Sequence, residues 1–529
     1  MKKILFYIFS LLLVSCNSGF LKEYSQDLAR VQSFSDLDEL VVGEAFLPTG
    51  MAYNTGYSVS LYNTNYLLLH YMTDELEENL NPPTNPDAMA LGYRTIMFPY
   101  FTWQQDVNLD YEKKNTQESQ EASYWNSAYT HIAACNMSMA ETNKLKVSGE
   151  DDEALYNKIN GEVHFLRAIY YYTLVNLYAQ PYQPATAATT PGVPIKITEY
   201  IEDKEYQRNS VEEVYRQIVS DLADAEKFLA NIHTPVSIHR VGINAVYLMR
   251  SRVALYMQDW ETAKKYAELS LGENKKLLSM LSWPETESPM NGDNPENVFA
   301  MGGATFGYTE FLHPGDDYYG TPYSPIFKVS DHLYNLYDEK DARKTTFFST
   351  QYGIGNAPYV TKIDYSDNSL SSYSQVSDQF YLRSAEAYLN LAEACAELGQ
   401  DGEAIKYLDE LRKNRIKDVV TTTATGNDLI KLIRQERERE FCFEGQRWYD
   451  MRRYAVDEKC PEVETVTHSF TSYVNKSFQY VPSTTVYYEL KTNDGGMVLN
   501  IPKSVRDFQN SIGGNERPLR NVTFTKVYN

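Results

Sequence analysis

Residues 161–178 read GEVHFLRAIYYYTLVNLY, and this stretch decides the fold. Its apolar side chains recur every three or four residues, which places them on one face of an α-helix. These side chains are Leu166, Ile169, Tyr170, Leu174 and Leu177. Pro181 and Pro184 follow, and proline ends a helix because it lacks an amide hydrogen and clashes with the preceding turn. The stretch therefore predicts a long amphipathic helix that ends before residue 181.

Two pairs of helices are predicted by a motif that occurs twice in the chain. The pairs cover residues 242–257 with 261–271, and residues 381–398 with 403–413. The second helix of each pair carries a similar motif, AKKY at 263–266 and AIKY at 404–407. A small alanine at the crossing and a turn just before it resemble tetratricopeptide hairpins. Because the copies lie 141 residues apart, we do not expect a tandem solenoid.

The remaining segments are predicted to be further helices and long loops. Ser35 is the predicted N-cap of the first helix, and helical spacing resumes at Ser123. Residues 148–153 are interpreted as a charged loop. Two insertions, residues 272–330 and 351–379, are rich in Gly, Pro, Asn, Asp, Ser and Tyr. Loops of this length on a helical scaffold are typical of binding proteins.

The N-terminus has the composition of an export signal. Two lysines precede an apolar run that is too short to span a bilayer. The run ends in LVSC at 13–16, which resembles a bacterial lipobox, whose cysteine is lipidated and becomes the first mature residue. An ordinary cleavable signal with a chance cysteine is the alternative. We expect residues 1–15 to be a lipoprotein signal peptide, Cys16 to carry the lipid and residues 16–34 to lead into the fold as a tether.

Charge and cysteine content exclude several classes of function. The chain has 49 basic and 71 acidic residues and a formal net charge of −22, whereas binding to nucleic acid depends on a surplus of Lys and Arg. Cys135 and Cys395 are expected to be buried thiols, and a disulfide between Cys442 and Cys460 is left open. Because neither a CxxC pair nor a His-rich cluster occurs, we expect no metal site and no cofactor.

The sequence contains no motif that indicates catalysis. A GxSxG elbow, an HExxH motif and a P-loop are all absent from it. Glycosidases need two carboxylates at a set separation, but acidic residues are so frequent here that their presence indicates nothing. We therefore expect that the protein is not an enzyme, with a lipoprotein hydrolase as the alternative.

An ordered series of motifs resembles the SusD/RagB family. The series begins with the helix quoted above, followed by RNSVEEVY at 208–215 and NPENVF at 294–299, a strand motif. It continues with RSAEAYLNLAEA at 383–394, RWYD at 447–450 and the final Ile501-Pro502. Each motif alone is modest, whereas the ordered set is specific and extends from the lipobox to the C-terminus.

This resemblance implies a mostly α, SusD-like fold with four tetratricopeptide-like helical hairpins and long loop insertions that contain short strands. It divides the chain into an N-terminal region, residues 35–271, and a C-terminal region, residues 272–529, which carries the variable ligand-binding loops and the last helical hairpins. It also implies a lipid-anchored protein of the outer membrane that faces the cell exterior. Such a protein captures oligosaccharide and delivers it to a partner TonB-dependent transporter. Peptide capture by the same mechanism and a tetratricopeptide interaction scaffold are the alternatives.

The candidate ligand site rests on aromatic side chains outside the helical motifs. Trp103 lies in a loop of turn residues, so we expect it to be exposed and to stack on the apolar face of a sugar ring. Glycan-binding members of the family tend to place an aromatic platform in this region. Nearby amides and carboxylates would meet the sugar hydroxyls. The predicted ligand-binding residues are Trp103, Tyr100, Gln104, Asp74, Tyr308, Tyr318, Tyr319 and Tyr323.

Charged residues within the motifs are expected to support the fold. Between residues 434 and 447 arginine and glutamate are interspersed, and Arg434 and Glu438 have the i,i+4 spacing of a helical ion pair. We predict a salt-bridge network that braces the last helical hairpin, with direct contact to the transporter as the alternative. Glu162 and Arg167, in the helix quoted first, are likewise expected to have structural roles.

Overall fold

The computed structural model describes residues 31–48, 67–80, 88–114, 121, 123–285, 287–303, 315–316, 322–323, 327–350, 357–363, 376–377, 379–477 and 479–528. Among the helices of these residues, none combines the length and the apolar composition needed to cross a membrane.

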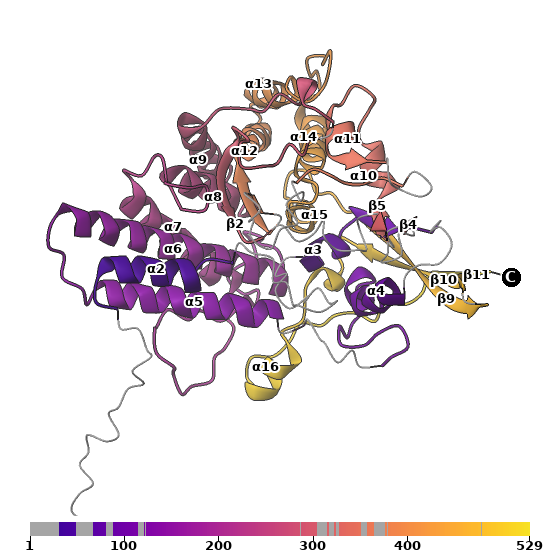
Figure 1. Ribbon diagram of the computed structural model, residues 1–529, viewed down its shortest axis with the longest axis horizontal. Coiled ribbons are helices and arrows are strands. Elements are labelled where there is room, and N and C mark those ends of the chain that lie inside the picture. The colour runs from indigo at the N-terminus through magenta and orange to yellow at the C-terminus, as the bar shows by residue number, and fades with distance from the viewer. Residues whose placement is uncertain are drawn as a thin grey trace, which may run out of the picture.

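Long helices form one half of the molecule, on the left of Figure 1. They are α2 (Phe34–Glu44), α5 (Ser123–Thr142), α6 (Glu150–Tyr178), α7 (Val211–Leu229), α8 (Ile243–Tyr256) and α9 (Trp260–Glu273). Helix α6 contains the stretch that decides the fold, ends before Pro181 as predicted, and packs against both α5 and α7. From Ile159 to Tyr178 every residue except the partly exposed His164 is buried, so it is the central helix of this half.

A second group of helices comes from the C-terminal part of the chain. It comprises α12 (Ser384–Glu397), α13 (Asp401–Arg412), α14 (Gly426–Phe441) and α15 (Arg447–Tyr454). Helix α12 packs against α13 and α14, and also against α9 of the first group. Ala267 of α9 therefore shares an apolar cluster with Ala385 and Leu389 of α12. The two predicted hairpins lie side by side in space although 141 residues separate them in sequence.

Short helices and strands fill the other side of the molecule. The helices are α3 (Leu67–Met72), α4 (Ala88–Phe101), α10 (Asp331–Asn335), α11 (Arg343–Thr346) and α16 (Lys503–Phe508), with 3-10 turns η3 (Met280–Ser282) and η5 (Gly495–Met497). Antiparallel pairs join β1 (Leu76–Glu78) to β5 (Phe327–Val329), β2 (Asn297–Met301) to β8 (Phe380–Arg383), β3 (Gly315–Asp316) to β4 (Pro322–Tyr323) and β6 (Phe348–Ser349) to β7 (Tyr359–Val360). Each pair links segments that are distant from the long helices in sequence.

A C-terminal sheet is the main element that the sequence analysis did not predict. It has the order β11-β10-β9, formed by β9 (Thr465–Lys476), β10 (Gln479–Lys491) and β11 (Phe524–Val527). Val466, His468 and Phe470 of β9 are buried at alternate positions, which is the two-residue period of a strand with one covered face. This alternation was available in the sequence as a signal.

Three predicted boundaries were wrong. Ser33, not Ser35, is the N-cap of α2, because Ser33 and Asp36 bond each other's backbone amides in a capping box. Residues 150–153 form the acidic first turn of α6 rather than a loop, since acidic side chains suit a helix N-terminus. Residues 381–383 belong to β8, where they pair with β2, so α12 begins only at Ser384.

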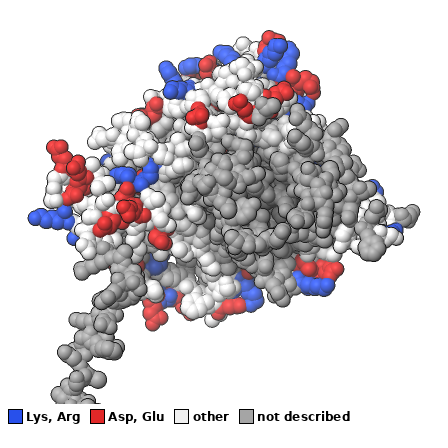
Figure 2. Space-filling view, viewed as in Figure 1, with Lys and Arg blue, Asp and Glu red and all other residues white. Residues whose placement is uncertain are grey.

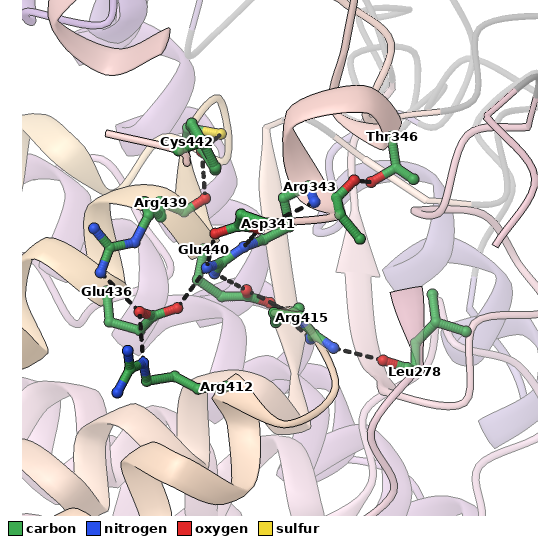
Figure 3. Close-up of polar contacts among 12 residues, drawn as sticks. Leu278, Asp341, Arg343, Thr346, Arg412, Arg415, Glu436, Arg439, Glu440 and Cys442 are labelled. Carbon is green, nitrogen blue, oxygen red and sulfur yellow. Dashed lines mark hydrogen bonds and ion pairs between the residues drawn. The ribbon is translucent and has the colours of Figure 1, made fainter. Parts of the chain in front are cut away.

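The predicted salt-bridge network is present and buried. Figure 3 shows arginine side chains converging on Glu436 and Glu440 of α14. Arg343 and Arg415 each contact Glu440 at 2.8 Å, and Arg439 contacts Glu436 at 2.8 Å. Burial alone would raise the pKa of Glu436, but the neighbouring arginines lower it to about 2. Because Glu436 and Glu440 are fully buried, they brace the fold and present no surface to a partner.

The predicted pair between Arg434 and Glu438 does not form. Arg434 contacts Glu397 and Glu462, each at 3.4 Å, whereas Glu438 faces a different cluster described below. The long Arg434 side chain instead reaches carboxylates on other segments of the chain.

The structural roles expected of Glu162 and Arg167 and the burial expected of Cys135 and Cys395 are confirmed. Glu162 accepts hydrogen bonds from Arg240, and Arg167 donates to Asp221 at 2.9 Å, all within the helical core. The cysteines at 135, 395, 442 and 460 are free and buried, so the disulfide that was left open does not form. Figure 2 shows that charged side chains of both signs lie along the upper and left margins of this face of the molecule.

Candidate functional site

One cavity in the described part of the chain has the size of a ligand site. It encloses about 450 Å³, while two other cavities there hold about 10 and 20 Å³, room for little more than a water molecule. We call it the polar pocket. It is lined by Asp74, Leu76, Glu77, Ser330, His332, Glu464, Thr465, Val466, Thr467 and His468.

Three segments that are distant in sequence build the polar pocket. Asp74 follows α3 and leads into β1, Ser330 caps α10, and Glu464 immediately precedes β9. The pairing of β1 with β5 brings the first two segments together, and Ser330 Oγ donates to the carbonyl oxygen of Asp74 at 2.5 Å. The packing of β1 beside β9 then closes the pocket on its third side.

An ion cluster around Arg447 forms one wall of the polar pocket. The Nη2 atom of Arg447 lies 2.6 Å from Asp74 and 2.9 Å from Glu464. The imidazole of His332 lies 2.8 Å from Glu438 of α14 and 3.6 Å from Asp74. Arg447 is only 5% exposed and His332 is 50% exposed, so the cluster extends from the interior to the solvent.

The two carboxyl groups beside Arg447 differ in their pKa. Burial alone would raise the pKa of Asp74, but the Arg447 guanidinium lowers it below its ordinary value. Burial raises the pKa of Glu464 despite the same guanidinium. The hydrogen bond to Glu438 raises the pKa of His332 to about 9, so its imidazole is cationic at neutral pH.

A stack of aromatic rings supports the polar pocket from below. His468 lies between Phe101 and Trp103, with ring centroids 4.0 and 4.4 Å away. Burial lowers the pKa of His468 to about 4, so its ring is neutral. Its Nδ1 lies 2.5 Å from the Phe101 carbonyl oxygen and must donate to it. The His468 ring also lies against the backbone of Thr73, and its Nε2 is buried.

The prediction that Trp103 is exposed was wrong. Its side chain is fully buried, and its Nε1 donates to the carbonyl oxygen of Met72 at 2.9 Å. Trp103 follows the C-terminal turn of α4 with φ 52°, a left-handed conformation that turns the chain inward. The indole thus packs beneath His468 and offers no face to a ligand, because α3 and β9 supply the partners that the local sequence lacked.

Two neighbouring predictions fail for the same reason. Tyr100 is 3% exposed and Gln104 is 7% exposed, and both pack at the end of α4. Among the predicted residues whose side chains the structure describes, Asp74 alone lines the polar pocket. Tyr308, Tyr318 and Tyr319 lie outside the described residues, as does Cys16, and only the backbone of Tyr323 is described, in β4.

Sequence reasoning missed most residues of the polar pocket. His332, Glu464, Thr467 and His468 are scattered over elements that are neighbours only after folding. The alternation of β9 could have identified Thr465 and Thr467 as one exposed face, but nothing in the sequence placed that face opposite β1.

A metal ion does not suit the cluster, although three of its side chains are close enough. Asp74, His332 and Glu438 each offer a ligand atom, and these atoms lie within 4.8 Å of one another. The guanidinium of Arg447 already contacts two of these carboxylates, at 2.6 and 3.4 Å. A cation would have to share them with this fixed positive charge, so the cluster is better described as an ion-pair network.

The chemistry of the polar pocket is that of hydrogen-bond acceptance. Carboxylate oxygens of Asp74, Glu77 and Glu464 and the threonine hydroxyls can all accept from a ligand. A ligand with many hydroxyl groups matches such a lining, since each hydroxyl can donate one hydrogen bond. The fold and the pocket thus define a mostly helical scaffold protein with an open polar binding site.

Comparison with known proteins supports this class. A family model described as "SusD family" matches residues 306–509, and one described as "Starch-binding associating with outer membrane" matches residues 74–255. SusD-like protein P38 of Formosa agariphila is 24% identical over 438 residues, 69% of this chain and 81% of that protein. SusD-like protein P2 of the same organism is 23% identical, over 63% of this chain and 71% of that protein.

Solved structures have the same fold. A SusD superfamily protein from Bacteroides thetaiotaomicron aligns with a TM-score of 0.67 at 20% identity, covering 92% of this chain and all of that one. A SusD-like carbohydrate binding protein from Bacteroides vulgatus aligns with the same TM-score at 19% identity, covering 91% and 98%. The chain belongs to the SusD/RagB family.

Proposed function

We propose that this protein is a lipid-anchored protein of the outer-membrane surface that captures oligosaccharide and delivers it to a TonB-dependent transporter. The observation that carries the proposal is the polar pocket, about 450 Å³ lined mainly by hydrogen-bond acceptors. A cavity of this volume is in the range of small-molecule sites, and its lining suits a polyhydroxylated ligand.

The comparisons support the same function. One matching family model is described as starch-binding and associated with the outer membrane, and one structural relative is called a carbohydrate binding protein. The lipobox at residues 13–16 is consistent with attachment to that membrane. The transporter as partner rests on the family resemblance.

A hydrolase is the second candidate, because the polar pocket contains a carboxyl pair with separated pKa values. Asp74 has a lowered pKa and Glu464 a raised one, and such separation is a feature of glycosidase acid–base pairs. However, both carboxyl groups contact the same Nη2 atom of Arg447, so they converge on a guanidinium rather than flank an open gap. We therefore favour binding without turnover.

Calorimetric titration of the purified protein with oligosaccharides and peptides tests the proposal. Thr467 is exposed at the pocket, so Thr467→Trp would fill the pocket without disturbing the core, and we expect at least about tenfold weaker glycan binding. Thr423→Trp, at an exposed threonine before α14, is the matched control.

Each outcome decides one part of the proposal. Unchanged glycan affinity in the Thr467→Trp protein would exclude the polar pocket as the site, and binding of peptides alone would favour peptide capture. Release of shortened sugars, detected chromatographically after incubation, would favour the hydrolase. Failure of a tagged protein to co-purify a TonB-dependent transporter from solubilised outer membranes would contradict the delivery step.

A further inference from the structure

We propose that the polar pocket selects its ligand by charge, accepting neutral and amine-bearing glycans and rejecting glycans that carry carboxylate or sulfate groups. This inference rests on the proposed function and deepens it by naming the class of sugar. It follows from which charged atoms at the pocket are free to meet a ligand.

Carboxylates outnumber cationic groups at the polar pocket. Five of them, Asp74, Glu77, Asp331, Glu438 and Glu464, belong to the pocket or to its ion pairs, against the three cationic side chains Lys328, His332 and Arg447. An excess of one sign in a cleft raises the local concentration of ligands of the opposite sign and repels those of the same sign.

The cationic groups are also already engaged. Arg447 is 5% exposed and divides its guanidinium among Asp74, Glu438 and Glu464. Lys328 is 16% exposed and contacts Glu77 at 2.6 Å and Asp331 at 2.5 Å. His332 is more open, but its Nε2 points at Glu438 and Asp74. A carboxylate or sulfate on a sugar would therefore have to break an existing ion pair to reach Lys328 or Arg447.

The acceptors, in contrast, remain accessible. The side chains of Glu77 and Glu464 are 33% and 35% exposed at the polar pocket, at least twice the exposed fraction of Lys328 or Arg447. Ligand hydroxyls can donate to these atoms, and an ammonium group can do so with the added attraction of opposite charge.

The test compares three probes of similar length on the intact protein. The probes are oligomers of N-acetylglucosamine, which are neutral, oligomers of glucosamine, which are cationic, and oligogalacturonates, which are anionic. The same measurement extends to further neutral, cationic and anionic oligosaccharides. We expect anionic sugars to bind at least about tenfold more weakly than neutral ones, because the excess of carboxylates over cationic side chains at the pocket repels an added negative charge. Raising NaCl from about 20 mM to about 500 mM should narrow the difference, since salt screens exposed charges.

Variants connect this difference to the polar pocket. The double variant Glu77→Gln/Glu464→Gln should reduce the discrimination between cationic and anionic probes several-fold. The control Glu403→Gln/Glu410→Gln removes two exposed carboxylates from α13 and should leave the discrimination unchanged. If the pocket variant does not fold, the salt dependence of the natural protein still decides the question.

The outcomes separate this inference from the proposed function. Anionic oligosaccharides binding as tightly as neutral ones would overturn the charge selection while leaving glycan capture intact. A discrimination that persists in high salt and in the double variant would also overturn it. Absence of binding to any sugar of any charge would remove the proposed function itself.

Discussion

Trp103 shows how one residue can serve a binding site without touching the ligand. Its indole is buried under His468, its N–H bonds the Met72 carbonyl, and its backbone adopts a left-handed conformation that is costly for a residue with a side chain. The packing of the indole offsets that cost and holds the floor of the polar pocket in place.

We expect Trp103→Ala to lower the free energy of unfolding by about 3 to 5 kcal/mol, because it deletes a fully buried aromatic side chain and leaves a cavity. Urea denaturation would measure this loss. Trp260→Phe, at a half-buried tryptophan that begins α9, is the control and should cost much less. A Trp103→Ala protein as stable as the natural one would mean that the indole is not in the core.

Glu397 makes stability depend on pH in the direction opposite to most carboxyl groups. Burial, followed by the nearby Asp457 and Glu393, raises its pKa to about 8 from an ordinary value of 4.5, and one of its oxygens has no hydrogen-bond partner in the described part of the chain. A raised carboxyl pKa means that the fold favours the protonated form. The stabilisation of the fold that comes from this raised pKa is therefore fully present below pH 4.5 and is lost as pH rises to about 8.

We accordingly expect Glu397→Gln to raise the melting temperature at pH 9 and to leave it nearly unchanged at pH 4.5. The gain at pH 9 should be on the order of 1 kcal/mol or more. Thermal denaturation at a series of pH values, with Glu410→Gln at an exposed site as the control, would reveal it. A variant that is less stable than the natural protein at pH 9 would show that the charged carboxylate is favourable in the fold.

At the scale of elements, helix α2 provides a direct test of how its boundary is set. Ser33 Oγ accepts from the amide of Asp36 at 3.1 Å, and the Asp36 carboxylate accepts from the amide of Ser33 at 3.1 Å. We expect Ser33→Ala to cost about 1 kcal/mol and to reduce amide protection over residues 37–41 in hydrogen exchange. Ser35→Ala, two residues further into the helix and exposed, should change stability by less than about 0.5 kcal/mol. Equal effects of the two changes would contradict the capping box.

The long helices could be predicted from sequence, whereas the site could not. Helices such as α6 and α8 can be recognised from the spacing of their apolar residues and from the proline, glycine and charged residues at their ends. Both signals depend only on residues that are near neighbours in sequence. The ends that were predicted wrongly, at Ser33 and at residues 381–383, were decided by a competing cap and by pairing with β2. The polar pocket depends on β1, β5 and β9 meeting, and these contacts span several hundred residues of sequence.

The same contrast explains why Asp74 was predicted and His332 was not. Asp74 lies near the aromatic segment around Trp103 in sequence, and this proximity was sufficient to include it among the predicted ligand-binding residues. His332 reaches Asp74 only because β5 pairs with β1 and positions the helix that follows it. A site assembled from three distant segments has no local signature.

At the scale of the whole molecule, the net charge disfavours contact with an anionic membrane surface, whereas the proposed lipid anchor favours it. A net charge of −22 keeps the body of the protein away from anionic surfaces, so membrane association must come from elsewhere. No helix of the described residues can cross a membrane. The lipid that we propose on Cys16 would supply an attachment, because each buried CH₂ contributes about 0.8 kcal/mol and several acyl chains together bind stably.

We therefore expect Cys16→Ala to release the protein from the membrane fraction and to abolish metabolic labelling with a fatty acid. Cys395→Ala, which removes a buried thiol from α12, is the control and should leave both unchanged. A variant at Cys16 that still incorporates the label would contradict the lipobox. A variant that loses the label but stays with the membrane would show that a membrane partner holds the protein without the lipid, which would support the proposed transporter complex.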